Sequence, residues 1–177
     1  MVRQRHFSGT IWEDQVGYCR ALRIGQQIWV SGTSPSDGEG GTFAPGDAYA
    51  QTMRCFEIVQ QALESVGADL SDVVRTRVYV TDMECWEDIA KAHYELFADH
   101  PPVNTMVEIP RLINPDMLVE IEVEAFCDEE PPPAPLTIPP KTTAKTILGR
   151  PIQSADYPPM STYPPTTARE LDEGCLD

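Results

Sequence analysis

Alternation of apolar and polar positions predicts five strands in the first 130 residues of the chain. Two short strands, in CRALRIG and QQIWVSG, meet at Gly25 and Gln26. A third strand is VVRTRVYVTD, a fourth begins after Pro101 and Pro102, and a fifth is LVEIEVEAF. Side chains that alternate in this way share a face of the sheet. The expected apolar face holds Val74, Thr76, Val78 and Val80 of the third strand and Val119, Ile121, Val123 and Ala125 of the fifth.

Apolar residues at steps of three and four predict two helices between these strands. The first runs from about Asp47 to Val66, because Asp47 can cap its start and Gly67 can end it in a left-handed turn. The second runs from about Asp82 to Ala98. Their apolar stripes are Met53, Phe56, Val59, Leu63 and Val66, and then Trp86, Ile89, Ala90, His93, Leu96 and Phe97.

The resulting order of elements, β-β-α-β-α-β-β, is typical of an α+β fold with both helices on one face of a single sheet. The other face would carry Arg75, Arg77, Tyr79, Glu120, Glu122 and Glu124. Such a face is either exposed to water or buried against another copy of the chain. Arginine opposite glutamate in neighbouring strands indicates, first of all, structural pairing.

Proline is concentrated at the end of the chain, where eleven of the 17 prolines follow Glu130. Proline lacks a backbone donor and favours extended polyproline II, so these segments rarely build a core. We therefore predict a folded domain over residues 1–129 and a mostly unstructured tail over residues 130–177. The segment PPPAP is a spacer or a ligand for an aromatic groove, and the spacer is the favoured interpretation.

The net charge of −15 makes nucleic acid and anionic membranes unfavourable partners, because an acidic surface repels phosphate groups. Five dispersed cysteines argue against a disulfide framework and against a zinc site. Neither a signal peptide nor a membrane-spanning stretch is evident. We therefore expect a cytoplasmic protein.

Single residues do not indicate a reaction. His6, His93 and His100 lack the spacing of a metal site or a catalytic triad, and His93 is expected to be a core or interface histidine. Ser31 lacks the G-x-S-x-G context of a nucleophile. No glycine-rich loop joins a strand to a helix in the way that phosphate binding requires.

Several motifs together resemble the RidA (YjgF/YER057c/UK114) family. They are VSG, GADLSDVVRTRVYVTDMECWEDI, MVEIPRL and LVEIEVEAF, and the similarity covers about residues 15 to 127. The resemblance implies a chorismate-mutase-like fold with a single mixed sheet. It also implies a homotrimer whose sheets line a central barrel, with clefts between subunits. Members of the family hydrolyse small reactive enamines and imines to a keto acid and ammonia, with no metal or organic cofactor.

The resemblance also implies which residues form the site. Glu120 matches the carboxylate that holds or activates water, and Glu108 matches a glutamate of the preceding strand. The residues expected to bind the substrate are Tyr18, Ser31, Asn104 and Met106. Asn104, in Pro-Val-Asn-Thr, stands where deaminases of the family carry the arginine of P-A-R-S.

The neutral amide of Asn104 changes the expected substrate. A charge-assisted pair contributes about 1.5–3 kcal/mol and a neutral hydrogen bond about 0.5–1.5 kcal/mol. The difference weakens carboxylate binding roughly tenfold. We therefore expect hydrolysis of imines or enamines without selectivity for 2-imino acids, unless Arg20 or Arg111 supplies the charge. A non-catalytic ligand-binding trimer is the alternative, and endoribonuclease activity is a weaker one.

Overall fold

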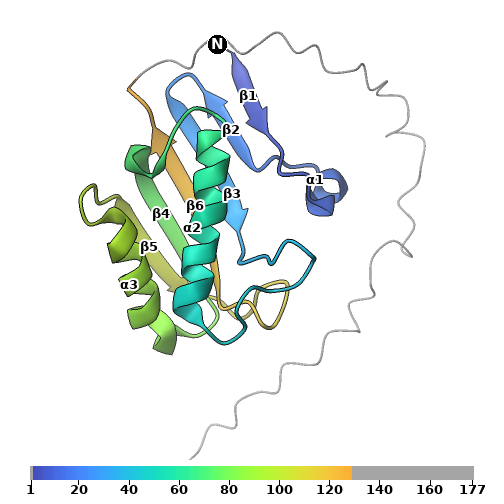
Figure 1. The fold of residues 1–177 in the computed structure, drawn as a ribbon, viewed down its shortest axis with the longest axis vertical. Helices are drawn as coiled ribbons and strands as arrows, with labels where there is room; N and C mark the ends of the chain where they lie inside the picture. Colours follow the sequence, from blue (N-terminus) through green and yellow to red (C-terminus); the bar gives the residue numbers. More distant parts are fainter. Residues whose placement is uncertain (1, 129–177) are drawn as a thin grey trace, which may run out of the picture. The chain divides into compact units, whose positions relative to one another are not determined.

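A six-stranded sheet with two long helices on one face makes up most of the part of the chain that the computed structural model describes, residues 2–128 (Figure 1). The strands are β1 (Arg3–His6), β2 (Ala21–Ile24), β3 (Gln27–Thr33), β4 (Val73–Val80), β5 (Val103–Glu108) and β6 (Val119–Phe126). The helices are α1 (Ile11–Val16), α2 (Ala48–Glu64) and α3 (Trp86–Phe97), with short 3₁₀ helices at Leu70–Asp72 and Met83–Cys85. The predicted tail, including PPPAP, lies outside the described residues.

The order of strands in the sheet is β1-β2-β3-β6-β4-β5. Only β4 and β5 pair in parallel among the described strands, and the other pairs are antiparallel. The predicted single mixed sheet of an α+β fold is therefore confirmed. The last strand of the described region, β6, lies in the middle of the sheet between β3 and β4.

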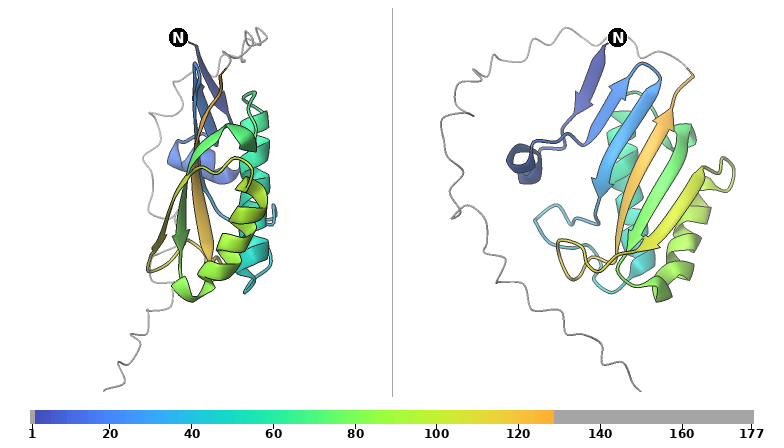
Figure 2. Two further views of the ribbon diagram at one scale, coloured as in Figure 1. Left: turned by 90° about the vertical axis from the view of Figure 1, so that its left-hand side faces the viewer. Right: turned by 180° about the vertical axis from the view of Figure 1, so that it is seen from behind.

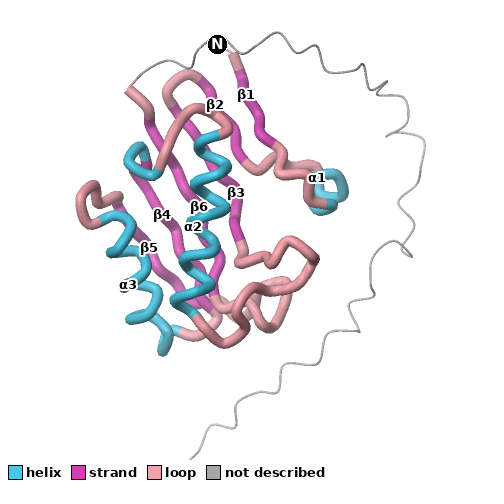
Figure 3. The backbone as a smooth tube through the Cα atoms, viewed as in Figure 1, coloured by secondary structure: helices cyan, strands magenta, loops and turns pink. Residues whose placement is uncertain are grey.

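Helices α2 and α3 cover the same face of the sheet, as predicted (Figures 2 and 3). The core lies between the two layers. Phe56, Val59 and Leu63 of α2 are almost completely buried, as are Val78 of β4 and Ile121 of β6.

Local signals in the sequence correctly place the β2–β3 turn and both ends of α2, whereas α3 begins at Trp86 and not at the predicted Asp82. The turn at Gly25 and Gln26 joins β2 to β3, with Ile24 opposite Gln27. The Asp47 side chain accepts a hydrogen bond from the Ala50 backbone N–H, at 2.8 Å, and so caps α2. Gly67 has a φ of 76°, which is the left-handed conformation expected after the helix.

Two elements near the N-terminus were not predicted. Strand β1 consists of Arg3, Gln4, Arg5 and His6, so it offers no apolar alternation, and it pairs with β2 only at the edge of the sheet. Helix α1 has six residues, which is too short for a periodic pattern. Glu13 stabilises the turn before it, because its carboxylate accepts hydrogen bonds from the backbone N–H groups of Ser8 and Gly9 at 2.9 Å.

Two predicted core positions are wrong. Val74 is 47% exposed, because a bulge in β4 places Val73 opposite Ala125 and Arg75 opposite Glu124. Val73 therefore fills the core position expected for Val74. Trp86 is 50% exposed at the first residue of α3, where the 3₁₀ helix that precedes it changes the helical phase.

The open face of the sheet carries the expected arginine–glutamate pairs between β4 and β6. Arg77 lies 3.4 Å from Glu122 and 2.8 Å from Glu124, and Arg75 lies 3.7 Å from Glu124. The structural pairing predicted from the sequence is confirmed. Trp29, Val103, Val107 and Phe126 are exposed large apolar residues on strands of the same sheet.

Arg23 of β2 is a buried cation that connects the β2–β3 turn to the end of α2. Its Nε donates to the carbonyl oxygen of Gly25 at 2.9 Å, and its Nη1 donates to those of Val66 and Gly67 at 2.8 and 2.9 Å. Only 2% of the residue is exposed. The three bonds give the buried guanidinium group acceptors in the β2–β3 turn and in the segment that follows α2.

Candidate functional site

Glu120, the predicted catalytic carboxylate, lies on β6 opposite Tyr79 and therefore on the face of the sheet away from α2 and α3. Its Oε2 accepts a hydrogen bond from Ser34 Oγ at 2.8 Å. Its Oε1 lies so close to Gly32 that a methyl group at position 32 would overlap it. The absence of a side chain at Gly32 thus lets the carboxylate lie against the end of β3.

Ser31 precedes Gly32 and is tied to the segment before β2. Its hydroxyl donates to the carbonyl oxygen of Cys19 at 2.8 Å, and its backbone N–H donates to that of Arg20 at 3.0 Å. The hydroxyl hydrogen is therefore occupied, and the oxygen remains available as an acceptor.

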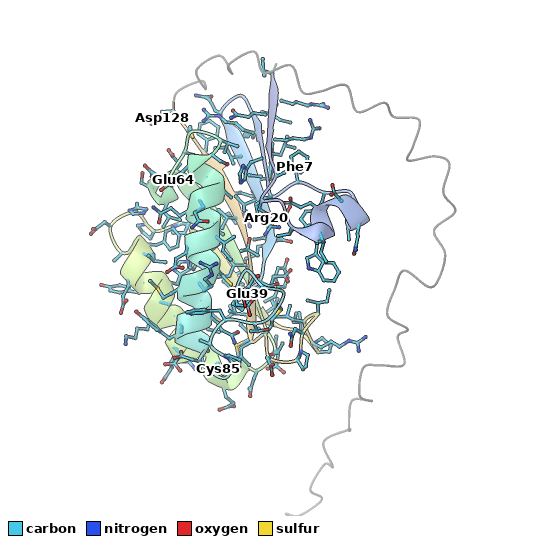
Figure 4. The ribbon with its side chains drawn as sticks, turned by 45° about the vertical axis from the view of Figure 1, so that its right-hand side comes forward. Phe7, Arg20, Glu39, Glu64, Cys85 and Asp128 are labelled. Carbon is cyan, nitrogen blue, oxygen red and sulfur yellow. The ribbon has the colours of Figure 1, made fainter. Side chains whose placement is uncertain are left out.

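Tyr18 is linked to the Ser31–Gly32 segment by Arg20 (labelled in Figure 4), which contacts both. The Arg20 guanidinium lies 5.5 Å from the centre of the Tyr18 ring and donates to the carbonyl oxygen of Gly32 at 2.9 Å. Arg20 is buried, and its Nε has no hydrogen-bond partner among the described residues. Contacts of Arg20 and Glu120 with Gly32 thus link the segments that carry Tyr18, Ser31 and Glu120 near the end of β3.

Asn104 and Met106 line a separate cavity of about 440 Å³ between the helices and strands β4 and β5. It is lined by Thr52, Phe56, Val78, Ile89, Ala90, His93, Tyr94, Phe97, Ala98, Pro101, Asn104 and Met106. None of these residues is aspartate, glutamate, lysine or arginine. The cavity is therefore mainly apolar, with a few polar groups that can orient a ligand.

His93 on α3 is the lining residue whose charge could change near neutral pH. Its ring packs against Phe97 at 4.7 Å and edge-on against Phe56 at 5.8 Å between ring centres. Burial lowers the pKa of His93 below its usual value, because the charged form loses contact with water. His93, which was expected to be a core or interface histidine, is thus half-buried and lines the cavity.

The two groups lie on opposite faces of the sheet of one chain. Asn104 is opposite Thr76, whose side chain is completely buried beneath the helices, whereas Glu120 is opposite Tyr79 on the other face. A single chain therefore brings Asn104 and Met106 together in one cavity, whereas Glu120 lies on the other face, beside the segment that carries Ser31 and Gly32. Strand β5 is at the edge of the sheet, so the cavity lies at the rim of the chain.

The other residues considered from the sequence lie elsewhere. Glu108 accepts a hydrogen bond from the Met83 backbone N–H at 3.0 Å and so stabilises the start of the 3₁₀ helix before α3. Arg111 is exposed beyond β5. Neither Arg20 nor Arg111 lines the cavity that contains Asn104.

Sequence reasoning missed four residues that shape these sites: Gly32 and Ser34 beside Glu120, and Thr76 and His93 beside Asn104. Two polar residues on otherwise apolar faces, Thr76 of β4 and His93 of α3, were a usable signal. Polar groups at buried positions need hydrogen-bond partners, and these two are partners of each other.

Within residues 2–128, no group of three or more histidine, cysteine, aspartate or glutamate residues is placed to hold a metal ion. The four described cysteines, Cys19, Cys55, Cys85 and Cys127, are free thiols. No helix in this part of the chain combines the length and the apolar character needed to cross a membrane.

Comparisons with known proteins agree with the fold. The family described as Endoribonuclease L-PSP matches residues 12–127. An uncharacterized protein of Streptomyces coelicolor is 34% identical over 119 residues, which are 67% of this chain and 88% of that protein. A RutC family protein of Pyrococcus abyssi is 36% identical over 62% of this chain and 85% of its own length.

Solved structures give the same result. A member of the YjgF/YER057c/UK114 family from Mycobacterium tuberculosis, Rv2704, is 42% identical with a TM-score of 0.65, over 71% of this chain and all (100%) of that one. The YjgF gene product of E. coli is 28% identical with a TM-score of 0.56, over 62% of this chain and 87% of that one. The resemblance seen in the sequence motifs is confirmed, and the chain belongs to the endoribonuclease L-PSP (YjgF/YER057c/UK114) family.

Proposed function

We propose that this protein hydrolyses small, uncharged imines or enamines and releases ammonia. The observation that carries the proposal is the cavity beside Asn104, which contains no charged side chain. In this proposal Asn104 replaces the arginine by which deaminases of the family hold a carboxylate. An amide offers neutral hydrogen bonds in place of a cationic fork, so an acidic substrate loses its anchor.

The proposed reaction adds one water molecule to a C=N bond. An enamine first becomes an imine by moving a proton to carbon. Glu120, held by Ser34, orients the water and accepts one of its protons as the oxygen attacks the imine carbon. The nitrogen takes up that proton and, as the carbinolamine hydroxyl becomes a carbonyl, the second proton of the water, and it leaves as ammonia. Tyr18 and Ser31 would hold the polar end of the substrate, with Ser31 as an acceptor.

In the proposed homotrimer, Glu120 of one chain would meet Asn104 and Met106 of a neighbouring chain, and the two sets would form one site. Glu120 faces away from the helices of its own chain, whereas Asn104 and Met106 lie on the edge strand β5, where a neighbouring chain can approach. In the proposed trimer, the open faces of three sheets surround a central barrel. Burial of Trp29 and Phe126, now 38% and 43% exposed, would favour this association.

We expect sedimentation equilibrium at micromolar concentration to give three times the chain mass of 19.7 kDa. The physical reason is the combination of exposed apolar residues and paired charges on one flat face, which a neighbouring copy can cover. A stable monomer under these conditions would contradict both the trimer and the shared cleft.

Replacement of Asn104 by arginine should improve hydrolysis of imino acids, such as 2-aminoacrylate-derived species, by about tenfold or more. Asn104 is exposed at the rim of the cavity, so the longer side chain has access to solvent. The measurement is ammonia release from freshly generated imines with and without a carboxylate. Wild-type protein should favour the uncharged imine.

Two variants control this experiment. Asn104→Gln keeps a neutral amide and should not gain activity on imino acids. Glu120→Gln in the arginine background should remove the gain, because the water-binding carboxylate is lost. If folded Asn104→Arg protein is no better than wild type, the charge at this position does not select the substrate. If wild type already prefers imino acids, the proposed substrate class is wrong.

The same assay separates the alternatives. Saturable binding of an imine analogue without ammonia release would support a ligand-binding trimer. Endoribonuclease activity, which the family name describes, is disfavoured by the net charge of −15, since an acidic surface repels the RNA backbone.

A further inference from the structure

Three polar side chains from three elements form a hydrogen-bonded chain along the wall of the cavity. Asn104 Nδ2 of β5 donates to Thr76 Oγ1 of β4 at 2.8 Å. Thr76 Oγ1 in turn lies 3.0 Å from His93 Nε2 of α3. Thr76 is completely buried, His93 is half-buried and Asn104 is exposed at the rim. These hydrogen bonds therefore connect the partly shielded imidazole of His93 to Asn104, which a ligand can reach.

A threonine hydroxyl has one hydrogen to donate, so the donor and acceptor roles of Asn104, Thr76 and His93 depend on one another. If Asn104 donates to Thr76, then Thr76 donates to an unprotonated Nε2 of His93. If Nε2 carries a proton, His93 donates to Thr76 and Thr76 donates to the Asn104 carbonyl oxygen. The mixed case, with both neighbours donating, leaves the buried hydroxyl hydrogen without an acceptor among the described residues, which is unfavourable.

The surroundings of His93 favour its neutral form. The residues that line the cavity from α2, β4 and β5 are Thr52, Phe56, Val78, Asn104 and Met106, and none of them titrates. On α3 itself, Tyr94 lines the cavity, while Lys91 and Glu95 both contact Tyr49 of α2. Beyond α3, His100 packs edge-on against Phe97. Burial without a nearby carboxylate disfavours a charged imidazole.

We propose that Thr76 and His93 are positioning residues that decide which end of the Asn104 amide is offered to a ligand. With neutral His93 that carries its proton on Nδ1, the amide nitrogen is tied to Thr76 and the carbonyl oxygen is free to accept an N–H or O–H of the ligand. With protonated His93, the carbonyl oxygen is tied and the NH₂ group is free to donate. The cavity then selects neutral donors near neutral pH and accepts carboxylates only on acidification.

This inference deepens the proposed function, because it names the ligand class of the same cavity, but it can be tested without any reaction. Nitrogen NMR of the histidine rings reports directly which ring nitrogen carries the proton. The His93 signals can be assigned by their loss in His93→Gln. At about pH 8 we expect the neutral form with its proton on Nδ1. A proton on Nε2 at this pH would overturn the proposed direction of the hydrogen bonds from Asn104 through Thr76 to His93.

Benzamide and benzoate are matched probes for the ligand class, since they share a ring and differ in offering N–H donors or a negative charge. Wild-type protein should bind benzamide more tightly at about pH 8. The benzamide-to-benzoate affinity ratio should fall as the pH is lowered from about 8 to about 5, and it should fall by about tenfold once His93 is fully protonated, which is the factor that separates neutral from charge-assisted hydrogen bonds.

Substitutions at Thr76 show whether the hydroxyl transmits this change. Thr76→Val has nearly the same shape without a hydroxyl, and its affinity ratio should change by less than about twofold over the same pH range. Thr76→Ser restores the hydroxyl and should restore the pH dependence. A Thr76→Val ratio that varies like the wild-type ratio would overturn the proposal.

The two proposals fail in different ways. If both probes bind as expected but no imine releases ammonia, the hydrolase function is wrong and the positioning role remains. If ammonia is released but the probe ratio does not depend on Thr76, the positioning role is wrong. If neither probe saturates wild-type protein at millimolar concentration, the ligand class named for this cavity is wrong.

Discussion

Replacement of Arg23 by methionine should lower the free energy of unfolding by about 3–5 kcal/mol. Methionine can fill the apolar path of the arginine side chain, but it donates no hydrogen bond. The carbonyl oxygens of Gly25, Val66 and Gly67 would then be left without the donor that Arg23 supplies. Each hydrogen bond to a charged group contributes about 1.5–3 kcal/mol, and the three are not additive.

Denaturant unfolding measures this change directly. Arg5→Met on the exposed strand β1 is the matched control, and it should change the free energy of unfolding by no more than about 0.5 kcal/mol. Arg23→Lys should be intermediate, since an ammonium group cannot reproduce the planar fork. A loss below about 1 kcal/mol in Arg23→Met would mean that water replaces the guanidinium at the end of α2.

Gly32→Ala should reduce imine hydrolysis by about a hundredfold while leaving the fold intact. The added methyl group would overlap Oε1 of Glu120, which is the end of a flexible side chain and can move away. The backbone at position 32 does not have the positive φ that would strain alanine. The carboxylate that orients water would thus be displaced, at little cost to stability. Ammonia release and the melting temperature, measured together, separate the two effects.

Gly41→Ala is a closely matched control. A methyl group at Gly41 would overlap an oxygen of Asp37 in the loop before α2, away from the proposed catalytic group. It repeats the clash between a methyl group and a carboxylate, and it should leave the rate unchanged. Equal loss of activity in both variants would show that general loosening, and not displacement of Glu120, is the cause.

The elements with strong periodic patterns were predictable from the sequence, and the irregular ones were not. The caps at Asp47 and Gly67 and the turn after Ile24 depend on residues close in the chain, so local chemistry specifies them. The bulge that exposes Val74 depends on pairing with Glu124 and Ala125, some fifty residues away. Strand β1 is polar throughout and becomes a strand only because β2 offers a free edge.

The sequence motifs indicated candidate residues for the site, but not how the fold arranges them. The motifs indicated Glu120 and Asn104, but their placement on opposite faces depends on the registers of β4, β5 and β6. The contact of Gly32 with Glu120 joins residues far apart in the chain, and no local pattern signals it. His93 looked like an ordinary core residue, because its link to Asn104 passes through Thr76, which alternates normally within β4.

The position of β6 in the middle of the sheet has a consequence for synthesis on the ribosome. Strand β6 is the last of the described strands to be translated, yet it separates β3 from β4. A nascent chain that ends before Val119 has two apolar-faced sheet fragments with open inner edges and no strand to join them. Such edges are sites for pairing with other chains. Folding of this domain is therefore completed only after Phe126 has emerged from the ribosome, and until then the inner edges of β3 and β4 stay open to pairing with other chains.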